Sequence, residues 1–363
     1  MGKTGTQSIG DHMWRTLYSP VSYGDKNALI PTQLGNDKIK WESTVQKDLG
    51  LDFSFMRGRL GGTFGYYHKV TDGTLLNMTP APSSSYSTVV FNIAKIRNQG
   101  LEFDIHGDFI RKKDFRWTGN LNISRNVSKV LDINGGPFSD PNDRDAMNLG
   151  TSVVKEGEPL GLLYGRVATG IIKTQAQLEA AREEFSLWTI FDPYLNLGDI
   201  AYEYEDGFWK EDVIGHATPD FFGGYTNTIN WNRFTLTALF TFSYGNDLIY
   251  QKDVSDSGMS SLANRGTRVL NHYSEDNTSS NRPRSMWATT YMLSSLNVYD
   301  ASYLKLKTLS LSYNLPESIC RKVRIKSASV YGTATNVFTI TSYPGPDPEV
   351  SDDPTSVIGG GRD

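Results

Sequence analysis

Apolar and polar residues alternate along long runs of this 363-residue chain, and this alternation limits its possible folds more than any other feature. From Phe234 to Tyr244 the even positions are apolar, and the odd positions are threonine or serine except for Leu239. From Leu101 to Phe109 the polar positions are Glu102, Asp104, His106 and Asp108. Because successive side chains of a strand point to opposite faces, each run predicts a strand with one apolar and one polar face.

The same alternation predicts further strands. They cover Trp41–Phe55, Arg59–His68, Trp117–Ser124, Tyr303–Leu315 and Ser327–Ile340. Within Tyr303–Leu315 the apolar phase slips by one residue, which predicts a β-bulge near Lys307 or Thr308. Helical patterns are rare: one helix is expected at Thr174–Phe185, and a turn or two at Glu317–Val323.

Short and long connections between these strands alternate along the chain. The short ones are Phe55–Gly58, Arg111–Asp114, Trp231–Arg233 and Pro316–Val323. The long ones are Thr71–Val90, Asp132–Asp220, Gln251–Asn297 and the stretch from Ser342 to the end. In an antiparallel meander, alternate connections lie at opposite ends, so every long loop falls on one side. Short turns on one side and long loops on the other are typical of outer-membrane barrels.

A soluble β-sandwich is the alternative, since its strands also alternate. Its strands average about five or six residues, however, whereas the runs here have about ten to fifteen. Aromatic residues also stand near the predicted strand ends, as the interfacial girdles of a barrel require. They are Trp231, Phe234, Tyr244, Tyr250, Tyr313 and Tyr343. We therefore predict an all-β fold, a segment of a transmembrane antiparallel β-barrel.

Composition excludes other classes of protein. No stretch approaches the roughly 18 consecutive apolar residues of a spanning helix, and 12% aromatic residues is too many for a disordered chain. A formal charge of −4 argues against a nucleic-acid partner. The single cysteine, Cys320, excludes an intrachain disulfide. The first residues, Met1 to Gly5, do not have the pattern of a secretory signal, so we expect either a cytoplasmic chain or a true start upstream.

Several segments, in their order and spacing, resemble the SusC/RagA-like TonB-dependent outer-membrane transporters. They are Lys40–Asp52, Asn92–Glu102, Glu156–Gly161, Tyr164–Gly165, Pro219–Phe221, Ser302–Lys307, Tyr313–Pro316, Asn336–Thr341, Tyr343–Gly345 and Asp347–Ser351. Barrels of this family have about twenty-two strands around a plugged lumen, and the present chain has about eight complete ones. The resemblance implies that residues 1–363 are the C-terminal part of such a barrel, without signal peptide, plug domain, N-terminal barrel strands or last strand.

The resemblance also implies a function and partners. The complete transporter would import oligosaccharides or peptides from the outer membrane, where lipid surrounds it. A SusD-like surface lipoprotein would cap the extracellular loops, and TonB would act through the missing plug region. A soluble carbohydrate-binding β-sandwich protein is the alternative, followed by a secreted glycoside hydrolase.

We expect no catalytic residues, no cofactor and no metal site. The five histidines are scattered, and the acidic loop after Gly198-Asp199-Ile200 lacks the spacing of a calcium loop. Two sets of residues are candidates for ligand contact. The polar row on one strand is expected to face a hydrated lumen: Glu102, Asp104, His106 and Asp108. Four aromatic residues of the acidic loop are candidates for stacking on sugar rings, or alternatively pack the loop: Tyr202, Tyr204, Phe208 and Trp209.

Overall fold

One antiparallel sheet of nine strands organises the chain. The computed structural model describes residues 2–6, 12–78, 86, 89–133, 146–184, 195–257, 264–285 and 293–349. The strands follow one another in the order β1-β4-β5-β6-β7-β16-β17-β20-β21. Their bounds are β1 Gly2–Thr6, β4 Glu42–Phe55, β5 Leu60–Met78, β6 Val89–Arg111, β7 Phe115–Asp132, β16 Phe221–Trp231, β17 Phe234–Tyr244, β20 Tyr303–Asn314 and β21 Ser329–Thr341.

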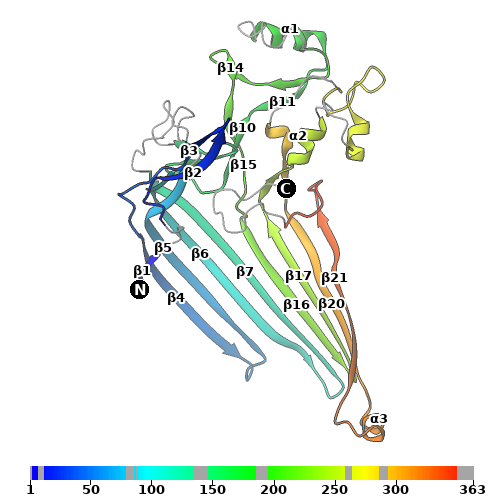
Figure 1. The fold of residues 1–363 in the computed structure, drawn as a ribbon. Coiled ribbons are helices and arrows are strands. Elements are labelled where there is room, and N and C mark those ends of the chain that lie inside the picture. Colours follow the sequence, from blue (N-terminus) through cyan, green and yellow to red (C-terminus); the bar gives the residue numbers. More distant parts are fainter. Residues whose placement is uncertain are drawn as a thin grey trace.

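The sheet is a curved meander whose long strands run side by side (Figure 1). Eight of its strands have 11 residues or more, whereas β1 has five. In the described part of the chain the sheet does not close, because β1 and β21 each pair with one neighbour only. This arrangement confirms the prediction of a partial antiparallel barrel with about eight complete strands.

The two faces of the sheet differ as the alternation predicts. On one face of β17, Leu236 lies opposite Leu311, and Phe242 lies opposite Leu304. On the other face, Thr237 lies opposite Ser310. The register shifts at Lys307 against both neighbouring strands, which confirms the predicted bulge. The bulge keeps the leucines of β20 on the apolar face on both sides of the slip.

Tight turns join the strands at one end of the sheet (the lower end in Figure 1). Between β16 and β17 the turn consists of Asn232 and Arg233, and Asn232 adopts a φ of 51°, which asparagine tolerates better than most residues. Between β20 and β21 the short helix α3, Glu317–Lys322, confirms the predicted helical turn after Pro316.

At the opposite end, the two longest connections form a layer of small elements. We call their described residues, 146–184, 195–220, 245–257, 264–285 and 293–302, the loop layer. A four-stranded sheet contains β8 Ala146–Asn148, β9 Ser152–Lys155, β10 Leu162–Arg166 and β15 Glu211–His216. Three two-stranded pairs are β11 Ala168–Ile171 with β12 Ile200–Tyr202, β13 Tyr204–Glu205 with β14 Phe208–Trp209, and β18 Asp247–Ile249 with β19 Val298–Asp300. The helices are α1 Gln175–Glu184, α2 Gln251–Ser257, and the 3₁₀ turns η3 Thr267–Asn271 and η4 Ser295–Asn297.

Helix α1 confirms the helix expected at Thr174–Phe185, although Phe185 lies outside the described residues. Its start follows from a capping box. The hydroxyl of Thr174 accepts a hydrogen bond from the backbone N–H of Gln177, and the Gln177 carboxamide accepts one from the N–H of Thr174. Among the described elements, no helix is both long and apolar enough to cross a membrane.

The buried apolar cores lie at the loop end of the molecule. One cluster joins the upper parts of β6 and β7 to the loop layer through Val89, Ala94, Ile96, Val130, Ile133, Val154 and Leu160. On the long strands, by contrast, large apolar side chains are exposed, among them Leu49 at 69% and Leu51 at 62%. The sheet therefore presents an apolar face that no described part of the chain covers, as a lipid-facing surface requires.

The predicted loop at Thr71–Val90 is wrong at both of its ends. Strand β5 continues to Met78 and β6 already starts at Val89, with Thr74 opposite Ala94. The register shifts between Thr71 and Leu75, and this irregularity hides the strand from a period-two pattern. The other strands expected at Leu101–Phe109 and Trp117–Ser124 also extend further at their loop ends. Of the expected long connections, residues 79–85, 87–88, 134–145, 185–194, 258–263, 286–292 and 350–363 lie outside the described residues.

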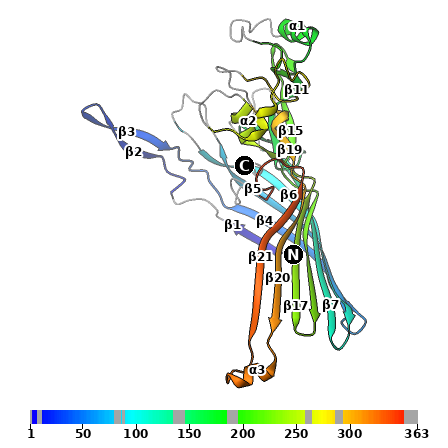
Figure 2. The same ribbon diagram turned by 90° about the vertical axis from the view of Figure 1, so that its right-hand side faces the viewer.

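A hairpin that the alternation did not predict precedes β4. It consists of β2 Leu17–Tyr23 and β3 Lys26–Gln33. Figure 2 shows that this hairpin projects away from the nine-stranded sheet. It pairs only with itself in the described part of the chain.

Loop and turn ends should differ in accessibility on intact cells. In the complete protein, an epitope tag inserted beside α1 or in the turn at Ser274–Asn277 should bind antibody without permeabilisation. A tag at Lys112–Lys113 or at Asn232 should not, because short turns face the periplasm in barrels of this layout. Surface fluorescence before and after permeabilisation measures the difference. Labelling of the turns on intact cells, without labelling of the loops, would show that the orientation is reversed.

Candidate functional site

The four residues predicted to face the lumen share the polar face of β6. Asp104 pairs with Thr63 of β5 and Asn122 of β7, so polar residues flank it on both sides. Asp104 also lies 3.7 Å from His106 and accepts a hydrogen bond from Asn120 at 3.3 Å. The structure thus brings the predicted row together on one face. Its contact with a ligand stays a prediction.

Asp108 differs from the rest of this row because its carboxylate forms an ion pair with an arginine. Arg116 donates hydrogen bonds to both of its carboxylate oxygens, at 2.7 Å and 3.1 Å. The Asp108 side chain is only 11% exposed. This bidentate pair neutralises Asp108 near the turn end of the strand. Glu102 and Asp104 are left as the carboxylates that make the middle of the face acidic.

The aromatic residues proposed for stacking lie on neighbouring short strands of the loop layer. Tyr204 pairs with Trp209 across a two-residue turn, in which Asp206 and Gly207 both have positive φ. The guanidinium carbon of Arg166 lies 3.9 Å from the centroid of the Trp209 ring. A cation therefore already covers one face of Trp209.

The other two rings stand in different surroundings. Tyr202 lies 6.0 Å from the same guanidinium carbon of Arg166, at the edge of a cation–π contact. Phe208 is 59% exposed. The structure thus brings Tyr202 and Trp209 together around Arg166 and supports the packing alternative for these two. Stacking on a ligand stays a prediction for Phe208.

Several carboxylates of the acidic loop take part in ion pairs. Asp199, in the Gly-Asp-Ile segment, is 5% exposed and accepts two hydrogen bonds from Arg284, at 2.7 Å and 3.0 Å. Glu203 accepts a hydrogen bond from Lys210 at 3.1 Å, and this bond raises the pKa of the Lys210 ammonium. Within the residues that the structure describes, no group of three or more His, Cys, Asp or Glu side chains could hold a metal ion.

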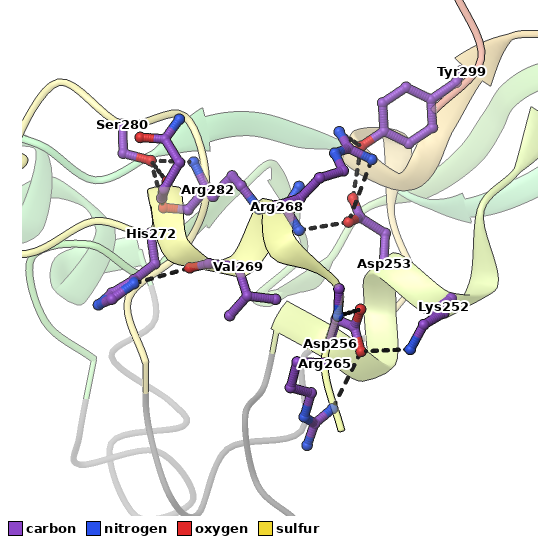
Figure 3. Close-up of polar contacts among 12 residues, drawn as sticks. Lys252, Asp253, Asp256, Arg265, Arg268, Val269, His272, Ser280, Arg282 and Tyr299 are labelled. Carbon is purple, nitrogen blue, oxygen red and sulfur yellow. Dashed lines mark hydrogen bonds and ion pairs between the residues drawn. The ribbon is translucent and has the colours of Figure 1, made fainter. Parts of the chain in front are cut away.

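A polar cluster that the sequence did not predict lies at α2, η3 and β19 (Figure 3). At its centre Asp253 of α2, 5% exposed, has three partners. Arg282 donates a hydrogen bond to it at 2.5 Å, and the Tyr299 hydroxyl donates one at 2.6 Å. The guanidinium of Arg268 completes the set at 3.6 Å.

A second carboxylate of α2 anchors the next segment of the chain. Asp256 accepts hydrogen bonds from Lys252 at 3.0 Å and from the backbone N–H of Gly266 at 3.1 Å, and it lies 3.6 Å from Arg265. Burial raises the pKa of Asp256, but these partners outweigh it and hold the pKa below its usual value. The carboxylate is therefore ionised at neutral pH and fixes η3 against α2.

Tyr299 and Arg268 are ordered by the same carboxylate. Burial raises the pKa of Tyr299, and the hydrogen bond to Asp253 raises it further, so the phenol stays protonated and donates to Asp253. Its oxygen can then accept from Arg268, at 3.3 Å. Burial lowers the pKa of Arg268, but Tyr299 and Asp253 outweigh it, and the guanidinium remains charged.

An open pocket of about 640 Å³ is lined in part by Asp253, Arg268, Arg282 and Tyr299. This volume lies within the range of small-ligand sites, roughly 300–1,000 Å³. The lining residues come from six elements or loops of the loop layer: Ile200, Asp253, Arg268, Asn271, Ser279, Ser280, Asn281, Arg282, Pro283, Leu296, Asn297 and Tyr299. No short motif marks them, since they are spread over a hundred residues of two connections. The only sequence signal is the density of charged residues between Lys252 and Arg284.

The fold and the position of this layer define the class of protein. An open antiparallel meander with one apolar face, tight turns at one end and elaborate loops at the other is a segment of a membrane-spanning β-barrel. Residues 16–238 of the 363 match the family model described as "TonB dependent receptor-like, beta-barrel". The chain therefore belongs to the TonB-dependent receptor β-barrel family, whose members lie in the outer membrane. This membership excludes the soluble β-sandwich.

Individual relatives agree with the family. The chain is 32% identical to TonB-dependent receptor P3 of Formosa agariphila, over 96% of this chain and 35% of that protein. It is 26% identical to TonB-dependent receptor SusC of Bacteroides thetaiotaomicron, over 96% of this chain and 34% of that one. These relatives confirm the SusC/RagA-like resemblance. The chain spans about a third of their length.

Solved structures show the same fold. The RagAB peptide importer in its "closed-closed" state matches with a TM-score of 0.76 at 23% identity, over 99% of this chain and 38% of that chain. The "open-open" state of the same importer matches with a TM-score of 0.71. The likeness holds for both states, so it supports the arrangement of strands and loop layer as a fold.

Proposed function

We propose that the complete receptor carrying this chain imports oligosaccharides or peptides across the outer membrane. The observation that carries the proposal is the nine-stranded sheet, which has one polar face and a loop layer at one end. It belongs to a chain of the TonB-dependent receptor family. A structural neighbour titled a peptide importer supports the peptide class, and the relative named TonB-dependent receptor SusC supports the role of a receptor. In this role the chain binds and guides a ligand, and no covalent bond is made or broken.

Within the complete receptor, this chain supplies the C-terminal part of the barrel. The plug, through which TonB delivers energy, belongs to another part of the protein. The polar row on β6 then faces the lumen, where Glu102 and Asp104 contact water or passing ligand. The loop layer lies on the extracellular side, and a SusD-like lipoprotein covers it.

Deletion of the gene and complementation test this function. The deletion strain should lose uptake of oligosaccharides or peptides that are too large for porins, while monosaccharides and single amino acids still enter. Loss of TonB should produce the same defect, because the transport step depends on its energy. Radiolabelled substrates of graded length measure the size at which uptake fails. Normal uptake of every large substrate in both strains would contradict the proposal.

Co-purification tests the lipoprotein partner. An affinity tag on the complete receptor should retain a surface lipoprotein of comparable abundance after mild detergent extraction. Removal of η3 and the turn that follows it, residues 267–277, should reduce that recovery if the loop layer forms the contact. A tag on an unrelated outer-membrane barrel of the same strain is the control. Recovery of the lipoprotein with that unrelated barrel would show that the association is non-specific.

A further inference from the structure

The pocket at α2, η3 and β19 carries an excess of positive charge. Of its twelve lining residues, Arg268 and Arg282 are cations and Asp253 is the only carboxylate. The neighbouring carboxylates Asp199 and Asp256 do not line it, and each is matched by its own cations. The exposed Glu275 and Asp276 do not line it either. The pocket is thus positive in a chain whose formal charge is −4.

A further cation stands behind the wall of the pocket. The ammonium of Lys173 donates to the carbonyl of Ser279 at 3.0 Å and to the carboxamide oxygen of Asn281 at 2.7 Å. Both acceptors are neutral, so this contact adds positive charge to the wall at Ser279–Arg282 without compensating it. The positive charge of the pocket attracts an anionic ligand and leaves the affinity for a neutral ligand unchanged.

Hydrogen-bond donors also outnumber acceptors in the pocket. The carboxamide oxygen of Asn281 is occupied by Lys173, and that of Asn271 accepts a hydrogen bond from Asn277 at 2.8 Å. Their oxygens being engaged, these two side chains offer their N–H groups to the pocket. The Ser280 hydroxyl already donates to the backbone carbonyl of Asn271. The polar surface left for a ligand is therefore a donor surface.

Arg268 is the cation best placed to meet a ligand. Its side chain is 39% exposed, against 14% for Arg282. A guanidinium has five N–H donors, yet Arg268 donates one hydrogen bond among the described residues, to Tyr299 at 3.3 Å. Its Nη1 atom is buried 3.6 Å from Asp253, so the N–H groups left for a ligand are those of Nε and Nη2. Asp253 and Tyr299 fix the position of the Arg268 guanidinium but do not use all of its N–H donors.

We propose that this pocket binds a carboxylate group of the ligand, with Arg268 as its ion-pair partner and Asn271 and Asn281 as additional donors. A guanidinium matches a carboxylate through two parallel hydrogen bonds, which favours this anion. The inference rests on the proposed import function, and it narrows the ligand to an acidic one. Such a carboxylate belongs either to an acidic peptide or to a uronic-acid sugar.

Binding to the complete receptor in detergent tests the pocket without any need for TonB. The probes are trigalacturonate with its methyl ester, and triglutamate with amidated triglutamine. In isothermal titration, one acidic probe should bind at least about tenfold more tightly than its neutral counterpart, since hydrogen bonds to charged groups are the stronger ones. Arg268→Gln should remove this preference, and Arg268→Lys should restore part of it. The acidic probe that binds identifies the source of the carboxylate.

Two further variants make the test independent of a folding defect. Asn281→Asp places a negative charge in the wall and should weaken binding of the acidic probe by about tenfold. Lys155→Gln, on the exposed side of β9 and outside the lining, should change that binding by less than about twofold. Equal affinity for acidic and neutral probes, or unchanged affinity in both Arg268→Gln and Asn281→Asp, would overturn the proposal. If the receptor imports its substrates but binds acidic and neutral probes equally, the proposed carboxylate site is wrong and the import function stands. If the receptor binds the acidic probe but imports no substrate, the import function is wrong and the carboxylate site stands.

Discussion

Replacing both Asp347 and Glu349 by alanine should destabilise the complete receptor by about 3–5 kcal/mol, because it leaves the buried ammonium of Lys305 without a counter-charge. Lys305 stands on the polar face of β20, and its side chain is 1% exposed. Its ammonium donates to Asp347 at 2.7 Å and 2.9 Å and to Glu349 at 2.7 Å. These contacts fasten the segment Ser342–Glu349, which follows the last described strand, to the sheet.

Removing Lys305 in place of its two carboxylate partners should destabilise the receptor far less. Lys305→Met removes the buried charge and leaves two partly exposed carboxylates, of which Glu349 keeps its hydrogen bonds to Lys307 at 2.9 Å and 3.1 Å. We expect a loss of about 1 kcal/mol or less, as for an exposed pair. The triple variant should be more stable than the Asp347/Glu349 double variant, since it has no unpaired buried charge. Guanidinium unfolding of the detergent-solubilised receptor measures all three, and equal losses would contradict the argument.

The same contacts make this segment sensitive to acid. Burial raises the pKa of Glu349, but the hydrogen bonds from Lys305 and Lys307 outweigh it and hold the pKa below its usual 4.5. A carboxylate with a lowered pKa in the folded state contributes stability above its ordinary pKa and loses it as the pH falls through the lowered one. The contribution of Glu349 is therefore complete above about pH 4.5, decreases as the pH falls below that value, and is lost once the pH has passed through the lowered pKa.

The second large effect separates the two faces of β17. Phe240→Arg should destabilise the barrel by about 2–4 kcal/mol more than Phe240→Ala, because arginine near the middle of a lipid-facing strand must enter hydrocarbon. Thr237→Arg should differ little from Thr237→Ala, since that face is hydrated. The assignment follows from the register, which places Phe240 opposite Leu306 and Thr237 opposite Ser310.

Alanine variants at both positions serve as controls for the loss of the original side chain. Unfolding in lipid vesicles by denaturant gives the four free energies, and heat-modifiable gel mobility reports whether each variant is folded. If arginine costs the same on both faces, neither face meets lipid. A larger loss at Thr237 than at Phe240 would invert the assignment of lumen and membrane.

The long regular strands were predictable from the sequence because their environment has two distinct sides. Lipid selects apolar side chains and the lumen selects polar ones, so β17 and the middle of β6 show a clear period of two. Even the bulge at Lys307 was visible, because the leucines of β20 must return to the lipid side after the slip. The helix expected at Thr174–Phe185 was also predictable, and the structure adds the capping box of Thr174 and Gln177 at its start.

Prediction was poorer where a strand leaves the two-sided environment. The loop-end parts of β5 and β6 pair beyond Thr71 through shifted registers, and their residues pack against the loop layer. β16 shows no clear alternation of its own, since Gly223 and Gly224 interrupt its pattern, and only the connections on either side predicted a strand there. At Gly223 a Cβ would approach the backbone oxygen of Asn122 to 2.1 Å, so close contact with β7 accounts for this glycine.

The sequence by itself determined the class of fold, the number of long strands, the ends at which loops and turns lie, and the polar row on β6. These features depend on neighbours along one strand and on the two media at its faces. The cluster of Asp253, Arg268, Arg282 and Tyr299 was decided only by the tertiary structure. Its members are common residues far apart in the chain, and their charges become informative only when folding places them around one pocket, away from bulk water.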